Sequence, residues 1–205
     1  MNAPDFSNVM LDLETMGNGP NAAIVAIGAV AFNIQDTEIS ADNFYTRVRL
    51  ESSVEHGGVI DSSTVLWWME QSEEARSEIA KKDGLHIIDA LEEFSHWIRT
   101  AAAGDESHVW GNGASFDNVI LRSAYQRRRI EPPWLWWNDR CYRTVKALHR
   151  DVPFERLGTH HKAIDDAISQ AQHLIRMLNP DARKPGCIKG DDCTIGTGYC
   201  TGCCS

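Results

Sequence analysis

Two apolar runs separated by a turn open the chain, and they constrain its fold more than any other feature. Residues 8–13 (NVMLDL) predict a short buried strand with a carboxylate near its end, and residues 22–32 (AAIVAIGAVAF) predict a second. The residues between them, 14–21, hold two Gly, one Pro and two Asn, which is the composition of a turn. Alternation over residues 43–50 (NFYTRVRL) indicates a third strand. We therefore expect an antiparallel meander at the start of the domain.

Helical periodicity follows this meander. Residues 61–64 (DSST) supply N-cap candidates for the next segment, and apolar residues recur at spacings of three and four over residues 86–102. A brief strand is expected at residues 108–110, closed by a Gly-rich turn. The expected helices cover residues 65–69, 73–82, 86–102, 117–129, 143–149 and 161–178. Strands followed by helices interleaved with a further strand predict a mixed α/β sheet protein.

Length and charge limit the class of protein. The 205 residues fit one ordinary α/β domain with a short appendage, and the formal net charge of −9 argues against a general polyanion binder. The N-terminus lacks the basic and apolar regions of a signal peptide. The longest apolar stretch, residues 22–32, is too short to span a bilayer. We expect a cytoplasmic protein without membrane association.

A pair of carboxylates lies at the end of the first predicted strand. Asp12 and Glu14 point to the same face of that strand, because side chains alternate with a period of two. Carboxylates so placed repel each other unless a cation lies between them. An exposed pair at a strand end is the simpler interpretation of an isolated Asp-x-Glu. The apolar neighbours within residues 9–13 favour a buried strand instead, and the Gly-rich turn that follows leaves room for a ligand.

Further candidate side chains lie in two later segments. Residues 112–117 (NGASFD) place Asp117 at the start of a predicted helix, where it is also a candidate cap, and Asn112 has an equal claim to a role in the turn. Residues 161–167 (HKAIDDA) place His161 at or just before another helix start. The apolar stripe of that helix has Asp166 beside it, whereas Asp165 lies further outward.

Together these segments resemble the DEDDh exonuclease superfamily, which includes polymerase proofreading subunits and oligoribonucleases. Its Asp-x-Glu motif is matched by DLET at residues 12–15, its Phe-Asp turn by residues 116–117, and its His-x-Ala-x-x-Asp motif by residues 161–166. That register selects His161 over His160 and Asp166 over Asp165. The segments LDLETMG, TVLWWMEQS, WGNGASFDNVILRSAY and HKAIDDA are similar to the exodeoxyribonuclease VIII-like and phage exonuclease A-like branch. The resemblance covers roughly residues 7–178.

This resemblance implies a ribonuclease H-like fold, with a mixed sheet whose first three strands are antiparallel and whose faces are flanked by helices. It implies a 3′–5′ exonuclease domain over residues 1–179 that hydrolyses single-stranded nucleic acid from its 3′ end to 5′-mononucleotides. The closer branch favours DNA, and a related branch that trims RNA 3′ ends or overhangs gives the main alternative. A non-catalytic nucleic-acid-binding domain is an alternative of another class. Because enzymes of this superfamily often form dimers, the resemblance also implies a possible homodimer.

Family roles follow residue by residue from the same match. Two Mg²⁺ or Mn²⁺ ions would be held by Asp12, Glu14, Asp117 and Asp166, since these ions prefer hard oxygen ligands. His161 would be the general base, because imidazole titrates near neutral pH. The resemblance thus names five catalytic residues, which are Asp12, Glu14, Asp117, His161 and Asp166.

Substrate contacts are expected beside the motifs, from Thr15, Met16, Trp68, Asn112 and Phe116. Met16 lies where the family packs an apolar side chain against the terminal base. Trp67 is an equal candidate for base stacking, although helical spacing predicts that one of the two tryptophans is core. The densest basic region is a candidate strand track or a solvated helix face, and it comprises Arg122, Arg127, Arg128, Arg129, Arg140, Arg143 and Lys146.

The last residues of the chain, 180–205, have no hydrophobic period and are rich in Gly and Cys. We expect this tail to be disordered or to form a small zinc-binding element. The thiols available for a structural Zn²⁺ are Cys187, Cys193, Cys200 and Cys203, and a tail that binds zinc would make the chain an adaptor as well.

Overall fold

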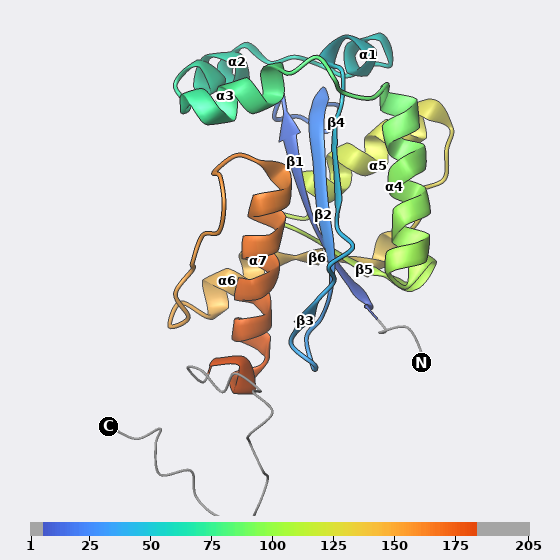
Figure 1. Ribbon diagram of the computed structural model, residues 1–205. Coiled ribbons are helices and arrows are strands. Elements are labelled where there is room, and N and C mark those ends of the chain that lie inside the picture. The colour runs from blue at the N-terminus through green and yellow to red at the C-terminus, as the bar shows by residue number, and fades with distance from the viewer. Residues whose placement is uncertain (1–5, 184–205) are drawn as a thin grey trace, which may run out of the picture.

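The structure is a computed structural model that describes residues 6–183 (Figure 1). A 3₁₀ turn at Pro180–Arg183 is the last described element. The cysteines of the predicted tail therefore lie outside the described residues, and so does the predicted zinc site.

A single mixed sheet forms the centre of the fold. Its strands are β1 (Asn8–Thr15), β2 (Ile24–Asn33), β3 (Glu38–Ile39), β4 (Phe44–Arg47), β5 (His108–Gly111) and β6 (Asp139–Cys141). The order is β3-β2-β1-β5-β6, with β4 also paired to β2. The first strands pair antiparallel, whereas β5 runs parallel to β1 and β6 parallel to β5. The predicted mixed sheet with an antiparallel start is confirmed.

Helices surround this sheet, and most of them match their predicted ranges within a few residues. They are α1 (Leu50–Glu55), α2 (Ser62–Met69), α3 (Glu73–Ala80), α4 (Ile87–Ala101), α5 (Asp117–Arg128), α6 (Tyr142–Leu148) and α7 (Ala163–Leu178). α1 was not predicted, and it shortens the third predicted strand because the chain turns into a helix at Leu50. Among residues 6–183, no helix is long and apolar enough to cross a membrane.

Opposite faces of the sheet are covered by different helices. α4 and α5 lie on one side, and α6 and α7 on the other, while α1, α2 and α3 lie beyond the end of the sheet toward which β1 points (Figure 1). Leu11 and Leu13 of β1 belong to the apolar cluster that includes α4 and α5. Met10 belongs to the cluster that includes α7. Since side chains alternate, Asp12 and Glu14 point to the α7 face, just where β1 ends.

Candidate active site

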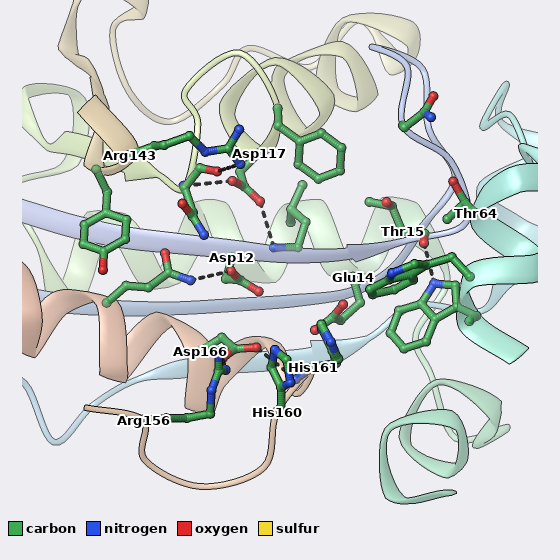
Figure 2. A pocket seen from close by; sticks show the side chains of 18 of the residues that line it. Asp12, Glu14, Thr15, Thr64, Asp117, Arg143, Arg156, His160, His161 and Asp166 are labelled. Carbon is green, nitrogen blue, oxygen red and sulfur yellow. Dashed lines mark hydrogen bonds and ion pairs between the residues drawn. The ribbon is translucent and has the colours of Figure 1, made fainter. Parts of the chain in front are cut away.

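A cavity of about 400 Å³ opens at the carboxyl end of β1. Side chains from β1, α2, the start of α5, α6 and α7 line it, together with the loop that precedes α7 (Figure 2). All of the carboxylates and the histidine predicted as catalytic are among these lining residues, which include Asp12, Glu14, Asp117, His161 and Asp166. The long-range folding of the chain therefore brings the three separate motifs to one place.

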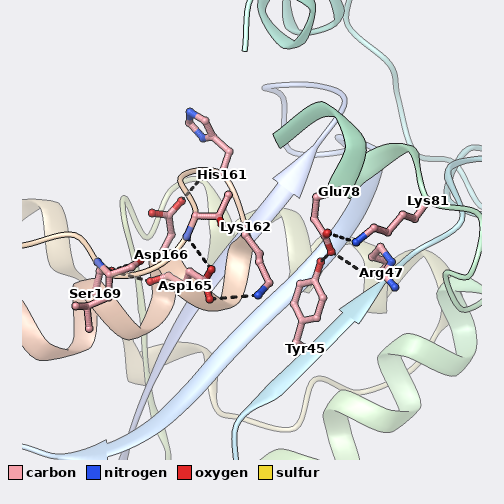
Figure 3. A network of polar contacts seen from close by, with 11 residues as sticks. Tyr45, Arg47, Glu78, Lys81, His161, Lys162, Asp165, Asp166 and Ser169 are labelled. Atoms are coloured by element: carbon pink, nitrogen blue, oxygen red, sulfur yellow. Dashed lines mark hydrogen bonds and ion pairs between the residues drawn. The ribbon is translucent and has the colours of Figure 1, made fainter. Parts of the chain in front are cut away.

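A triad of carboxylates forms the centre of this cavity. One ligand oxygen each from Asp12, Glu14 and Asp166 lies within 4.8 Å of the others. β1 supplies the first two side chains, and the first turn of α7 supplies Asp166. Asp165 points away from the triad, where it accepts hydrogen bonds from Thr159 N (2.9 Å) and Lys162 Nζ (3.4 Å) (Figure 3). The choice of Asp166 over Asp165 agrees with this geometry.

Asp117 lies beside the triad and bridges two strand ends. It is buried, and its Oδ1 accepts from Leu13 N (3.2 Å) while its Oδ2 accepts from Asn112 N (3.0 Å). Asp117 is the first residue of α5 and Phe116 is its N-cap residue, so a simple capping role does not describe it. Gly111 permits this approach, because a Cβ there would lie 2.4 Å from Asn118 Oδ1 and 3.1 Å from Asp117 Cβ.

The electrostatics of the site favour protonation in the absence of a cation. Burial raises the pKa of Glu14 to about 8, and the Asp166 and Asp117 charges add to that rise. Burial also raises the pKa of Asp117 to about 7, against the lowering effect of its backbone donors. The pKa of Asp12 lies well above its usual range, through burial first and then the neighbouring carboxylates; a hydrogen bond from Gln170 Nε2 (2.8 Å) opposes this rise.

These residues fit divalent cations. Glu14 Oε1 is buried without a hydrogen-bond partner in the described part of the chain, which is costly unless a ligand compensates it. The donors are carboxylate oxygens, the type that Mg²⁺ and Mn²⁺ select over imidazole or thiolate. Close like charges in a buried place are the condition that a bound cation relieves. A histidine-containing set, His160, His161 and Asp166, also has ligand atoms within 4.8 Å.

His161 lies at the rim of the triad in a left-handed backbone conformation, with φ of 62°. Its backbone N–H donates to Asp166 Oδ2 (2.9 Å), and its ring stacks on His160 with centroids 3.6 Å apart. The ring edge also contacts Trp67, at a centroid distance of 4.9 Å. Burial lowers the pKa of His161, so the ring is neutral and able to accept a proton at pH 7.

Predicted substrate contacts divide into those that line the cavity and one that does not. Thr15, Trp68, Asn112 and Phe116 line it. Met16 is not among the lining residues; its backbone N–H donates to Ala23 O and its carbonyl accepts from Asp61 N.

The two tryptophans of α2 have different environments. Trp68 is only 4% exposed, and its Nε1 donates to the Thr15 carbonyl at 2.9 Å. Trp67 is 42% exposed and lines the cavity. Trp68 therefore fixes α2 to β1, and Trp67 has the more exposed ring of the two.

Gln170 and Arg156 are among the lining residues that the sequence did not predict. Gln170 lies four residues after Asp166, one turn further along α7. This spacing places both side chains on one helix face, which the sequence could have indicated. Arg156 lies in the irregular segment before α7, where no periodicity marks it, and it forms an ion pair with Asp166.

A mixed sheet that carries these carboxylates and a histidine at the end of its first strand defines a DEDDh-type 3′–5′ exonuclease of ribonuclease H-like fold. The chain belongs to the family described as the 3′-5′ exoribonuclease Rv2179c-like domain, whose model matches residues 7–178. An exodeoxyribonuclease of Enterobacteria phage T4 is 32% identical to it over 162 residues, which cover 68% of this chain and 70% of the relative. The expectation of an exonuclease is confirmed.

Solved structures agree on the fold. The nuclease domain of 3′hExo, a DEDDh family member bound to rAMP, has a TM-score of 0.58 and 16% identity, covering 89% of this chain and 96% of that one. Exonuclease I of E. coli, in complex with an oligonucleotide, has a TM-score of 0.55 and 14% identity. The match covers 87% of this chain but 42% of the E. coli enzyme. The predicted ribonuclease H-like fold is thereby confirmed.

Proposed function

We propose that this exonuclease hydrolyses the 3′-terminal phosphodiester of single-stranded nucleic acid with the help of two Mg²⁺ or Mn²⁺ ions, releasing 5′-mononucleotides. The observation that carries the proposal is the convergence of Asp12, Glu14 and Asp166 within 4.8 Å, in a cavity open to solvent. The nuclease domain spans residues 1–179 in this proposal, and the family match over residues 7–178 supports that boundary.

Asp12, Glu14 and Asp166 would hold one of the cations, because these three carboxylates form the close group. Asp12 and Asp117 would hold the second, with the Asp117 carboxylate fixed by Leu13 N and Asn112 N. When bound, the cations would supply charge neutralisation at the scissile phosphate and would lower the pKa of the attacking water.

His161 accepts the proton of the attacking water at a ring nitrogen. Its pKa is lowered by burial, so the neutral form that a base requires predominates at physiological pH. The rings of His160 and Trp67 position the imidazole of His161. The backbone N–H of His161 donates a hydrogen bond to Asp166 Oδ2. Base and metal ligand are therefore coupled through one hydrogen bond.

The terminal nucleotide lies between β1 and α2. Trp67 stacks on the terminal base, and Phe116 lines the cavity near Asp117. Thr15 is held in place by a hydrogen bond from its hydroxyl to the Gly17 carbonyl (2.7 Å) and by the Trp68 indole on its own carbonyl. A single-stranded 3′ end fits such a cavity, because an unpaired terminal base is free to turn its face toward the Trp67 ring.

The proposed substrate is DNA, because the phage exodeoxyribonuclease is 32% identical to this chain. RNA is the second candidate, and the observation that favours it is the exoribonuclease description of the family whose model matches. The contact that distinguishes the two sugars is one to the 2′-hydroxyl of the terminal nucleotide.

One assay tests polarity, metal and sugar together. Single-stranded DNA and RNA of matched sequence, each labelled at the 5′ or the 3′ end, are incubated with the protein in Mg²⁺, Mn²⁺ or EDTA. We expect 5′-labelled strands to shorten stepwise and 3′-labelled strands to release labelled mononucleotide at once, with neither reaction in EDTA. Asp12→Ala is the inactive control. Full activity of purified Asp12→Ala protein, or degradation from the 5′ end, would overturn the proposal.

A further inference from the structure

The two ends of the active-site cavity differ in chemistry. At one end the lining is uncharged, and it comprises Thr15, Gly17, Asn18, Thr64, Trp67 and Trp68. Elsewhere the lining is basic: Lys146 and Arg156 lie against the Phe154 ring, and Arg143 lies one turn before Lys146 on α6. Figure 2 shows Arg143 beside Asp117 and Arg156 beside Asp166, whereas Thr15 and Thr64 lie to the right, beyond Glu14. The cavity thus has one end suited to a base and another suited to phosphates.

Two cations of the basic end, Arg143 and Lys146, are exposed. Neither Arg143 nor Lys146 forms an ion pair within residues 6–183; Arg143 donates from Nη2 to the Asn112 carbonyl at 2.6 Å. Arg156, by contrast, is paired with Asp166. The Arg143 charge lowers the pKa of Asp117, but no carboxylate of the described residues forms an ion pair with Arg143 or Lys146. A polyanion is the ligand that their charge fits.

An aromatic ring holds the basic end in position. Lys146 Nζ lies 4.8 Å from the centroid of Phe154 and 5.9 Å from that of Tyr142, while Arg156 Cζ lies 5.5 Å from Phe154. The Phe154 ring in turn packs on the ring of His173 in α7, with centroids 5.3 Å apart. Cations placed over fixed rings lose less side-chain entropy when a ligand binds.

The rest of the basic region in the sequence does not share this position. Arg122 is paired with Asp139, and Arg140 donates to the Trp137 carbonyl. Arg128 lies at the far end of α5, which begins at the site with Asp117, so it is about 16 Å along the helix axis at 1.5 Å per residue. Of the region predicted as a strand track, Arg143 and Lys146 are therefore the members that line the cavity.

We propose that Arg143 and Lys146 form a subsite for the phosphates upstream of the scissile one, so that the exonuclease prefers single strands of three or more nucleotides to a dinucleotide. This inference rests on the proposed function, because it takes the scissile phosphate to lie at the carboxylates. With the terminal base at the uncharged end, the strand leaves the cavity across α6. The preference comes from backbone phosphates, so it applies to DNA and RNA alike.

The test compares the dinucleotide TpT, which has no upstream phosphate, with the hexanucleotide (dT)₆. For the wild type we expect kcat/KM on the hexanucleotide to exceed that on the dinucleotide by about tenfold or more, carried mainly by KM. Lys146→Ala reduces this ratio severalfold, and it lowers the slope of log kcat/KM against log salt concentration by about one. Lys146→Arg restores both. Lys146 gives the clearer variant, because Arg143 also holds the Asn112 turn.

Arg128→Ala is the matched control, since it removes the same charge from an exposed helix position that does not line the cavity. It keeps the wild-type length ratio and salt slope. If Lys146→Ala and the Arg143→Ala/Lys146→Ala double variant keep them too, the subsite is overturned while the exonuclease assignment stands. If the wild type removes no nucleotide from any 3′ end, the proposed function itself is overturned.

Discussion

Gly28 on β2 lies directly against Ala163 at the start of α7: a Cβ at Gly28 would be 2.3 Å from the carbonyl carbon of Ala163. Gly28 is also the antiparallel partner of Asp12 in the β1–β2 register. The missing side chain thus lets α7 begin on the sheet surface right beside Asp12. This contact sets the depth at which Asp166, three residues into the helix, meets the carboxylates of β1.

Gly28→Ala should therefore damage stability and metal binding together. The added methyl group meets backbone rather than a movable side chain, so α7 must shift, at a cost of about 3 kcal/mol in the free energy of unfolding. We expect a lower Tm and weaker Mn²⁺ binding by calorimetry. Gly19→Ala is the control, because a Cβ there has no neighbour within 4 Å. A Gly28→Ala protein with wild-type Tm and Mn²⁺ affinity would contradict this account of the site.

The adjacent aspartates of α7 give a matched pair of variants. Asp166→Asn should weaken Mn²⁺ binding at least about tenfold, because even the outer partners of metal ligands contribute that much. Asp165→Asn should retain Mn²⁺ binding but lose about 1–2 kcal/mol of stability, since Asp165 accepts from Thr159 N and pairs with Lys162. Calorimetric titration and thermal unfolding separate the two effects. The reverse pattern would place Asp165 in the site instead.

The buried carboxylates make the stability of the metal-free protein depend on pH. The pKa of Glu14 is raised from 4.5 to about 8 by burial, so the folded state binds more protons than the unfolded state between those values. Stability is therefore fully present below about pH 4.5 and is lost as pH rises through 8. In EDTA, we expect Tm to fall over this window, by roughly 2–4 °C for each kcal/mol lost. Mg²⁺ should raise Tm most at the alkaline end.

Controls for the pH effect are available within the chain. Glu14→Gln removes the titrating group, so its Tm should depend less on pH than that of the wild type. Asp36→Asn removes the same charge from an exposed turn residue and should leave the slope unchanged. A wild-type Tm that stays flat or rises between pH 5 and pH 8 in EDTA would show that the carboxylates are not desolvated as the structure indicates.

Much of this site could be predicted because its residues follow local rules. A period of two places Asp12 and Glu14 on one face of β1, and the structure has them there. The apolar stripe of α7 separates Asp166 from Asp165 in the same way, since a helix turns each neighbour by a fixed angle. Long, strongly patterned elements such as β2 and α7 were predictable for this reason.

The features that were missed depend on contacts distant in sequence or on very short segments. β3 and β6 have two and three residues, too few to show any alternation. Gln170 reaches Asp12 across 158 positions; its spacing of four from Asp166 indicates a shared helix face but does not predict the contact with Asp12. Trp67 and Trp68 are adjacent on a helix of eight residues, so the spacing alone did not say which of them is core.

The same two tryptophans should separate substrate binding from stability. Trp67→Ala should raise the KM for a single-stranded oligonucleotide by about tenfold, because stacking on a base contributes roughly 1–3 kcal/mol. Trp67→Phe retains an aromatic face and should recover most of that loss. Trp68→Phe instead removes the indole donor to the Thr15 carbonyl, which should lower the free energy of unfolding by about 1 kcal/mol or more. Steady-state kinetics and thermal unfolding of the three variants test this division. If Trp68→Phe raised KM at an unchanged Tm while Trp67→Ala left KM unaltered, the assignment of Trp67 to the terminal base would be wrong.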